Sequence, residues 1–243
     1  GLTFPEDHRR SYAVDVPPLF ANRRDDREIQ EVVTNTLADV IRMTPGNVLV
    51  FFPSYAEAER YHGRLSGEIS ARRYLDEPGV AVEERRKAFV EDENGAMFTS
   101  LWGTLAEGVS FDGDAARTVA IVGVPYPRLD KRTEAVQDAY EHAFGDRAEN
   151  AGWRYAVEIP TVRKTRQAMG RVLRSPEEVA VRALIDRRYT RESRTAMPRY
   201  SVNTTFPPEE RRELVDVEPE KLKFAMLNFF RDVGAWAGEP PAP

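Results

Sequence analysis

Hydrophobic positions along the chain follow two different periods. From residue 26 to residue 43 they recur every three to four positions, which predicts an amphipathic helix ending before Pro45 and Gly46. Short uninterrupted runs of aliphatic and aromatic residues are instead typical of strands buried on both faces of a parallel sheet. These runs cover residues 47–52, 96–102, 118–124 and 179–185.

Helical patterns separate the predicted strands. Ser54 and Glu57 form a capping-box pattern that opens one helix. Further helices are expected at 55–65, 82–91 and 131–144, from Pro160 through residue 174, just after Pro208, and at 219–233, with a short strand at 153–159. The alternation predicts one α/β domain over residues 25–236, with helices on both faces of the sheet. We expect an extended lead-in over residues 1–24 and a flexible tail over 237–243.

Residues 167–174, which read QAMGRVLR, combine chemistry with helical spacing. On a helix, Gln167, Gly170, Arg171 and Arg174 would share one face, and the apolar residues between them would pack inward. An interior glycine costs about 1 kcal/mol relative to alanine, which a merely solvated arginine face does not explain. We therefore expect the two guanidinium groups to face a phosphate, the alternative being a solvated face.

The ends of the predicted strands carry the other candidate segments. Carboxyl ends of parallel strands meet at one edge of a sheet, where functional loops gather. Residues 53–55, 103–112 and 125–127 follow three of the strands, and the helix from Pro160 is expected beside them. The basic run from Arg187 to Arg199 is predicted to be a solvated face, with contact to a DNA backbone as the alternative.

Composition narrows the possible chemistry. The chain has no cysteine, which excludes disulfides, thiol catalysis and iron–sulfur ligation by its own residues, and its three histidines are dispersed. The net charge of -5 leaves any contact with nucleic acid to local basic groups. The start resembles no signal peptide, and no run of 18 apolar residues occurs, so we expect a cytoplasmic protein without a membrane contact.

A phosphate-binding loop is missing from the sequence. No glycine is followed by lysine, so the Gly-x-x-x-x-Gly-Lys-Ser/Thr pattern is absent, as is an Asp-Glu-x-His box. The arginines of residues 167–174 would therefore complete a nucleotide site without forming the phosphate cradle.

Five segments, in this order and spacing, resemble one family. They read NVLVFFPSY (47–55), GTLAEGVSF (103–111), GVPYP (123–127), QAMGRVLR (167–174) and DRRY (186–189). Together they are similar to the second RecA-like motor domain of the XPD and DinG group of superfamily 2 DNA helicases. The first, second and fourth segments correspond to helicase motifs IV, V and VI.

The resemblance implies the carboxyl-terminal half of a 5′-to-3′ repair helicase, from an archaeal or bacterial cytoplasm and inactive alone. ATP and Mg²⁺ would bind mainly to the first motor domain, which carries the phosphate loop and an iron–sulfur cluster in this family. Implied partners are that domain, in the same polypeptide or complex, single-stranded DNA and repair proteins. The implied catalytic residues are Gln167, Arg171 and Arg174; the implied ATP-binding residues are Glu107, Gly108, Asp112 and Gly170; the implied DNA-binding residues are Ser54, Tyr55, Thr104 and Tyr126.

The sequence departs from the family at one position and leaves other functions open. Ser110 stands where the family usually has aspartate in motif V, and Asp112 could compensate. A packing role for Tyr126 competes with base stacking. As a whole, the domain could instead dock a regulatory partner without ATPase activity, or be an unrelated doubly wound nucleotide-binding domain.

Overall fold

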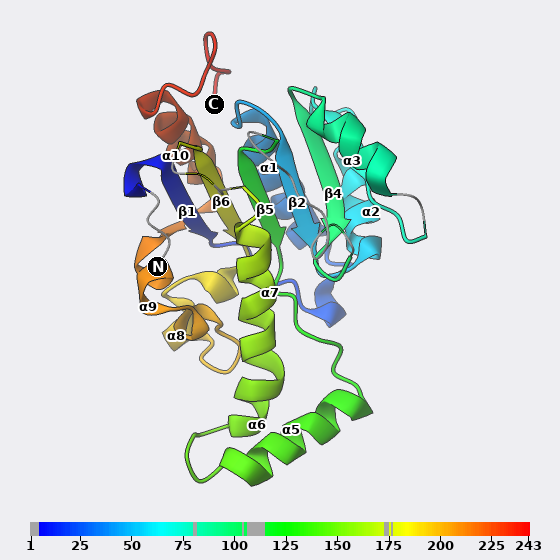
Figure 1. Ribbon diagram of the computed structural model, residues 1–243, viewed down its shortest axis with the longest axis vertical. Helices are drawn as coiled ribbons and strands as arrows, with labels where there is room; N and C mark the ends of the chain where they lie inside the picture. The colour runs from blue at the N-terminus through cyan, green and yellow to red at the C-terminus, as the bar shows by residue number, and fades with distance from the viewer. Residues whose placement is uncertain (1–4, 80–81, 104, 106–114, 173–174, 176) are drawn as a thin grey trace.

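A seven-stranded, all-parallel sheet forms the centre of the protein (Figure 1). The computed structural model describes residues 5–79, 82–103, 105, 115–172, 175 and 177–243. Across the sheet the order is β3-β4-β2-β5-β6-β1-β7. The strands are β1 (Arg9–Val14), β2 (Val48–Phe52), β3 (Arg72–Leu75), β4 (Gly95–Ser100), β5 (Thr118–Val122), β6 (Ala180–Ile185) and β7 (Leu214–Val217).

The four strands predicted from apolar runs are confirmed as β2, β4, β5 and β6, and they lie side by side in the sheet. Every residue of β2, β4 and β5 is buried, as expected for strands covered on both faces. The stretch expected as a lead-in contains β1, which pairs with β6 on one side and β7 on the other. Residues 9–14 are therefore part of the sheet rather than a lead-in to it.

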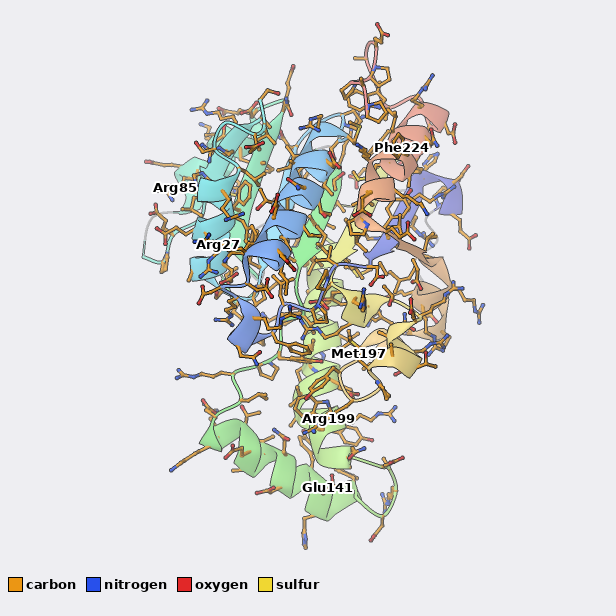
Figure 2. All side chains as sticks on the ribbon, turned by 180° about the vertical axis from the view of Figure 1, so that it is seen from behind. Arg27, Arg85, Glu141, Met197, Arg199 and Phe224 are labelled. Atoms are coloured by element: carbon orange, nitrogen blue, oxygen red, sulfur yellow. The ribbon has the colours of Figure 1, made fainter. Side chains whose placement is uncertain are left out.

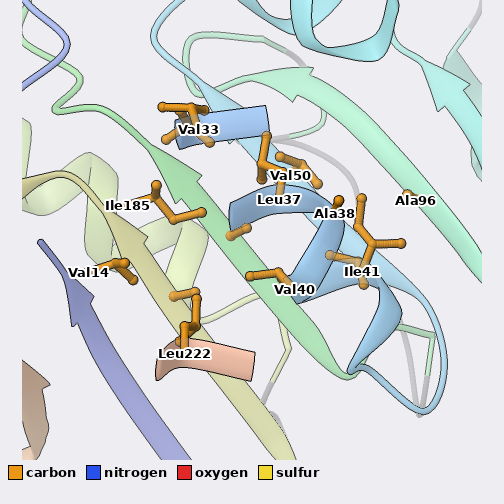
Figure 3. Packing of buried hydrophobic residues seen from close by; sticks show 14 of the residues in the cluster. Val14, Val33, Leu37, Ala38, Val40, Ile41, Val50, Ala96, Ile185 and Leu222 are labelled. Carbon is orange, nitrogen blue, oxygen red and sulfur yellow. The ribbon is translucent and has the colours of Figure 1, made fainter. Parts of the chain in front are cut away.

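Helices cover both faces of the sheet, as predicted. α1 (Arg27–Arg42), α2 (Tyr55–Arg64) and α10 (Pro219–Asp232) pack on one face, where their apolar residues form a core cluster with alternate strand residues (Figures 2 and 3). α3 (Val82–Val90) and α7 (Ile159–Met169) cover the other face. The Ser54 hydroxyl accepts a hydrogen bond from the Glu57 backbone N–H at 3.3 Å, which confirms the predicted start of α2.

A helical hairpin extends beyond the carboxyl edge of the sheet. α5 (Lys131–Phe144) has the predicted bounds, and none of its residues is buried. It packs against α6 (Ala151–Trp153), which continues through a π-helical turn (Arg154–Glu158) into α7 (Figure 1). The strand predicted at 153–159 is therefore wrong. A proline in a helix lacks an N–H and crowds the carbonyl four residues earlier, and the wide π turn ends at Glu158, two residues before Pro160.

Short elements complete the described chain. They are η1 (Glu6–His8), η2 (Ala21–Arg23), η4 (Arg187–Tyr189), α8 (Ser193–Ala196), η5 (Asn203–Thr205) and α9 (Pro208–Glu213). Among the described residues, no helix combines the length and apolar composition needed to cross a bilayer.

Candidate nucleotide and nucleic-acid interface

The motif VI segment begins in α7 but leaves the helix earlier than predicted. α7 ends at Met169, Gly170 is its C-cap, and Arg171 follows in a turn closed by its N–H to the Ala168 carbonyl at 3.0 Å. The prediction of a helix that continues past Met169 is therefore wrong for residues 170–172, and Arg171 lies in the turn that follows the helix. Glycine is a poor helix former, which suits it to the end of a helix.

The inward and outward sides of this segment are as predicted. Ala168 and Met169 are buried in the core cluster beneath α7, whereas Gln167 and Gly170 are exposed. Among the described residues, a Cβ at position 170 would approach only the Arg166 and Gln167 carbonyl oxygens, at 3.5 and 3.6 Å. The described residues around position 170 therefore do not require glycine there.

Contacts along α7 place its last two turns beside the carboxyl edge of the sheet. The Thr165 hydroxyl lies 3.3 Å from the Tyr189 hydroxyl, which donates to the Gly123 carbonyl just after β5. One residue earlier, the Lys164 Nζ lies 4.9 Å from the centre of the Trp102 ring, just after β4. The motif VI helix thus meets the segments that follow β4 and β5, as the predicted convergence requires.

The segments after β2 and β4 also touch each other. Ser54 and Tyr55 lie at the start of α2, directly after β2. The Tyr55 hydroxyl occupies the space beside Gly103, where a Cβ would lie only 2.4 Å from it. Motif IV and the first residue of motif V are therefore in direct contact.

A buried carboxylate that sequence reasoning missed lies under this contact. Asp76 follows β3, is 3% exposed, and accepts hydrogen bonds from the Thr99 hydroxyl at 2.6 Å and from the Tyr55 side chain. Burial raises the pKa of Asp76, although both hydrogen bonds and the charge of Arg85 act in the opposite direction. In the sequence it looked like one more polar loop residue before Pro78.

Tyr126 is engaged within the protein. Its hydroxyl donates to the Tyr200 carbonyl at 2.9 Å, and its ring meets the Trp153 ring at a centroid distance of 5.7 Å. Burial raises the pKa of Tyr126 to about 12. These contacts favour the packing interpretation over base stacking.

The DRRY segment supplies a buried ion pair next to Tyr126. Arg188 is 1% exposed and donates to Asp186 from Nε at 2.8 Å and from a terminal nitrogen at 2.6 Å. Its guanidinium lies between the rings of Phe20, at 4.8 Å, and Tyr126, at 5.3 Å. Burial would lower the pKa of Arg188, but the charge and hydrogen bonds of Asp186 outweigh it and raise the pKa. The prediction of a solvated basic face is wrong for this arginine.

Several predicted site residues lie outside the described part of the chain. They are Thr104, Glu107, Gly108, Asp112 and Arg174, together with Ser110. Among the residues that are described, no group of three or more histidine, aspartate or glutamate side chains is arranged to hold a metal ion. Gln167 and Arg171 suit an anionic phosphate, but the described residues offer no carboxylate set for Mg²⁺.

The parallel sheet with helices on both faces, and functional segments gathered at its carboxyl edge, defines a RecA-like α/β domain. A model of the helicase C-terminal domain family matches residues 37–203, and the chain belongs to that family. The fold is similar to that of an XPD helicase structure, with a TM-score of 0.66 and 20% identity over 86% of this chain and 35% of the other. The fold is also similar to that of S. cerevisiae Dbp5 bound to RNA and ADP BeF3, with a TM-score of 0.55 and 13% identity over 94% of this chain and 46% of the other.

The sequence relatives include two proteins that are named as helicases. The chain is 28% identical over 195 residues to the ATP-dependent DNA helicase chl1 of Schizosaccharomyces pombe. It is 26% identical over 194 residues to the general transcription and DNA repair factor IIH helicase subunit XPD/RAD3 of Saccharomyces cerevisiae. Each alignment covers 73% of this chain but only 23% and 24% of the relatives. The resemblance to the second motor domain of XPD-type DNA helicases is confirmed, and the chain spans about a quarter of the length of these relatives.

Proposed function

We propose that the chain is the carboxyl-terminal motor half of an ATP-dependent, 5′-to-3′ DNA helicase that acts in repair. The observation that carries the proposal is the meeting of three motif segments at one edge. α7 brings motif VI beside the ends of β4 and β5, and Tyr55 of motif IV touches Gly103 of motif V. In this proposal, the phosphate loop, the magnesium ligands and an iron–sulfur cluster belong to a first motor domain.

Motif VI supplies the nucleotide-facing groups. Arg171 and Arg174 stabilise the charge that develops on the transferred phosphoryl group, because a guanidinium stays protonated and offers several donors. Gln167, exposed on the last turn of α7, orients the attacking water or a terminal phosphate oxygen. Gly170 lets the first motor domain approach the end of the helix, and Glu107, Gly108 and Asp112 of motif V contact the nucleotide.

Motif IV and the start of motif V form part of the path of single-stranded DNA. Ser54, Tyr55 and Thr104 contact the DNA strand. Tyr126 supports the carboxyl edge of the sheet through its packing. The contact between Tyr55 and Gly103 supports a link between DNA and the nucleotide, because motif V continues from Gly103 towards Glu107 and Gly108.

The motif VI arginines can be tested in the complete helicase. An arginine finger contributes about 10³ to 10⁵ in rate to phosphoryl transfer, so Arg174→Ala should reduce DNA-stimulated ATP hydrolysis at least a hundredfold. Arg163→Ala, which removes an exposed arginine from the same helix, is the matched control and should retain the wild-type rate. A near-normal rate for Arg174→Ala in folded protein would contradict the assignment and favour a partner-docking module.

The isolated 243-residue chain gives a second test. Without a phosphate cradle it should hydrolyse no ATP, whether or not single-stranded DNA is added. Phosphate release by the purified chain, measured at several DNA concentrations, checks this expectation. Turnover that copurifies with the chain through successive columns would show that the site is complete without a first motor domain.

A further inference from the structure

Trp102 is a large aromatic residue left exposed at the carboxyl edge of the sheet. It follows β4 and is 43% exposed. The cationic Nζ of Lys164, a residue that is itself 9% exposed, lies 4.9 Å from the centre of its ring. An exposed indole beside a fixed positive charge suits a nucleobase attached to a phosphate, because the ring can stack while the cation attracts the backbone.

The backbone that carries Trp102 is tightly held. Its N–H donates to the Ser100 hydroxyl at 3.2 Å, and the next N–H, of Gly103, donates to the Ser100 carbonyl at 2.9 Å. A Cβ on Gly103 would lie 2.4 Å from the Tyr55 hydroxyl and 2.9 Å from its Cζ, so only glycine lets the tyrosine ring rest on this turn.

Asp76 holds the tyrosine in that position. Its carboxylate accepts from Tyr55 and, at 2.6 Å, from the Thr99 hydroxyl, while its backbone N–H extends the β3–β4 ladder to the Phe98 carbonyl at 2.9 Å. Burying a carboxylate without a direct ion pair is costly, and the raised pKa of Asp76 reflects that cost. Simple packing of Tyr55 would not require such a group, whereas fixing its hydroxyl in one place does.

We propose that Trp102 stacks on a base of single-stranded DNA and that Asp76 is a positioning residue that sets Trp102 through Tyr55 and Gly103. The inference rests on the proposed helicase function and adds a DNA-binding residue to it. It also explains why the buried Asp76 lies beneath the contact between Tyr55 and Gly103. In the proposed function, the Tyr55 segment contacts the DNA strand and the segment that begins at Gly103 leads to the nucleotide. Trp102 contacts the DNA, and the turn that carries it continues along the chain into motif V.

The test uses the complete helicase and a fluorescein-labelled oligodeoxythymidylate. Trp102→Ala should weaken DNA binding, measured by fluorescence anisotropy, roughly five- to a hundredfold, the range that loss of one stacked base gives. Trp102→Phe keeps an aromatic surface and should retain most of the affinity. The DNA concentration that gives half-maximal stimulation of ATP hydrolysis should rise in Trp102→Ala.

The positioning role needs a double-mutant cycle. Asp76→Asn should weaken DNA binding in the wild-type background and have a clearly smaller effect in the Trp102→Ala background, because part of its effect passes through the indole and the rest through Tyr55. Asp92→Asn is the matched control, because Asp92 accepts from the Tyr74 hydroxyl at 2.8 Å at the other end of β4 and should leave DNA binding unchanged. If Asp76→Asn does not fold, Tyr55→Phe removes the same hydrogen bond without a change of charge.

Two results would overturn the inference while the proposed function stands. One is a DNA affinity of Trp102→Ala within about twofold of the wild type. The other is a double variant whose fold-loss of DNA affinity equals the product of the losses in Asp76→Asn and Trp102→Ala. A wild-type enzyme that neither binds the oligonucleotide nor shows DNA-stimulated hydrolysis would overturn the proposed function itself, and this inference with it.

Discussion

At the scale of single residues, Arg188 shows how much the interior depends on one charged pair. It is almost fully buried with Asp186, which also accepts the Leu19 backbone N–H at 3.1 Å. Arg188→Ala leaves that carboxylate buried without its cation, so we expect a loss of about 3–5 kcal/mol in the free energy of unfolding. Urea unfolding followed by circular dichroism measures this loss.

Arg187, the neighbouring residue, forms a more exposed ion pair and so shows how much of the contribution of Arg188 comes from its burial. Arg187 pairs with Asp15, but their side chains are 39% and 28% exposed. Exposed pairs contribute about 0–1 kcal/mol, so Arg187→Ala should change stability far less than Arg188→Ala. Equal losses in the two variants would show that the burial of Arg188 is not the source of its contribution.

At the scale of secondary-structure elements, Asn47 joins segments that the sequence keeps apart. Its side-chain nitrogen donates to the carbonyls of Phe89, Asp92 and Ala115 at 2.9, 2.7 and 3.1 Å, and its oxygen accepts from the Gly95 N–H at 2.6 Å. One amide thus connects the start of β2 with the end of α3, the start of β4 and the approach to β5.

Removing that amide should loosen several elements at once. Each buried polar group left without a partner costs about 1–3 kcal/mol, so Asn47→Ala should lower the free energy of unfolding by at least about 2 kcal/mol. Hydrogen exchange should also accelerate at the starts of both β2 and β4. Asn94→Ala, at an exposed position nearby, is the control and should stay within about 0.5 kcal/mol of the wild type. Faster exchange confined to β2 would contradict the joining role.

Elements with a continuous apolar pattern could be predicted from the sequence, and elements with a mixed pattern could not. The four strands that were predicted are apolar runs in the middle of the sheet. β3 and β7 are edge strands of four residues, and β3 begins with two arginines, so no such run marks them. β1 lies between β6 and β7 but starts with Arg9 and Arg10, which gave it the look of a polar leader.

The candidate site divides in the same way. Ser54, Tyr55, Gln167 and Arg171 belong to local motifs, which sequence alone can reveal. Asp76 and Arg188 matter because tertiary packing buries them, and burial of a polar side chain leaves no local pattern. The end of α7 at Met169 was missed because the helical spacing of the apolar residues continues past Gly170.

At the scale of the whole molecule, the candidate site and the contacts of the segment after α10 lie at opposite edges of the sheet. Tyr55, Trp102, Tyr126 and the end of α7 gather at or beside the carboxyl edge. The amino edge instead has a cavity of about 850 Å³, bounded by Asn47, Arg117 and the segment after α10. Arg117 donates to the Ala235 carbonyl at 2.9 Å there, which ties the end of the chain to the approach to β5.

Glu213 connects the last three strands in the order of the sheet, β6, β1 and β7, and makes stability depend on pH. Glu213 lies just before β7. Its carboxylate accepts hydrogen bonds from Arg9 of β1 at 3.1 Å and from Arg182 of β6 at 2.9 Å. Burial alone would raise the pKa of Glu213, but the hydrogen bonds and charges of the two arginines lower it below the value of 4.5 expected in the unfolded chain. A lowered pKa means that the folded state binds the proton less readily than the unfolded state.

The stabilisation by Glu213 is fully present above its unfolded pKa and is lost as the pH falls through its folded pKa. Glu213→Gln should therefore be less stable than the wild type near pH 7, and the difference in the free energy of unfolding should shrink steadily below about pH 4.5. Urea titrations between about pH 7 and pH 3 at constant ionic strength measure both curves, with the exposed Glu59→Gln as the control that should run parallel to the wild type. Curves for Glu213→Gln and wild type that stay parallel over this range would mean that the carboxylate does not hold β1, β6 and β7 together through its charge.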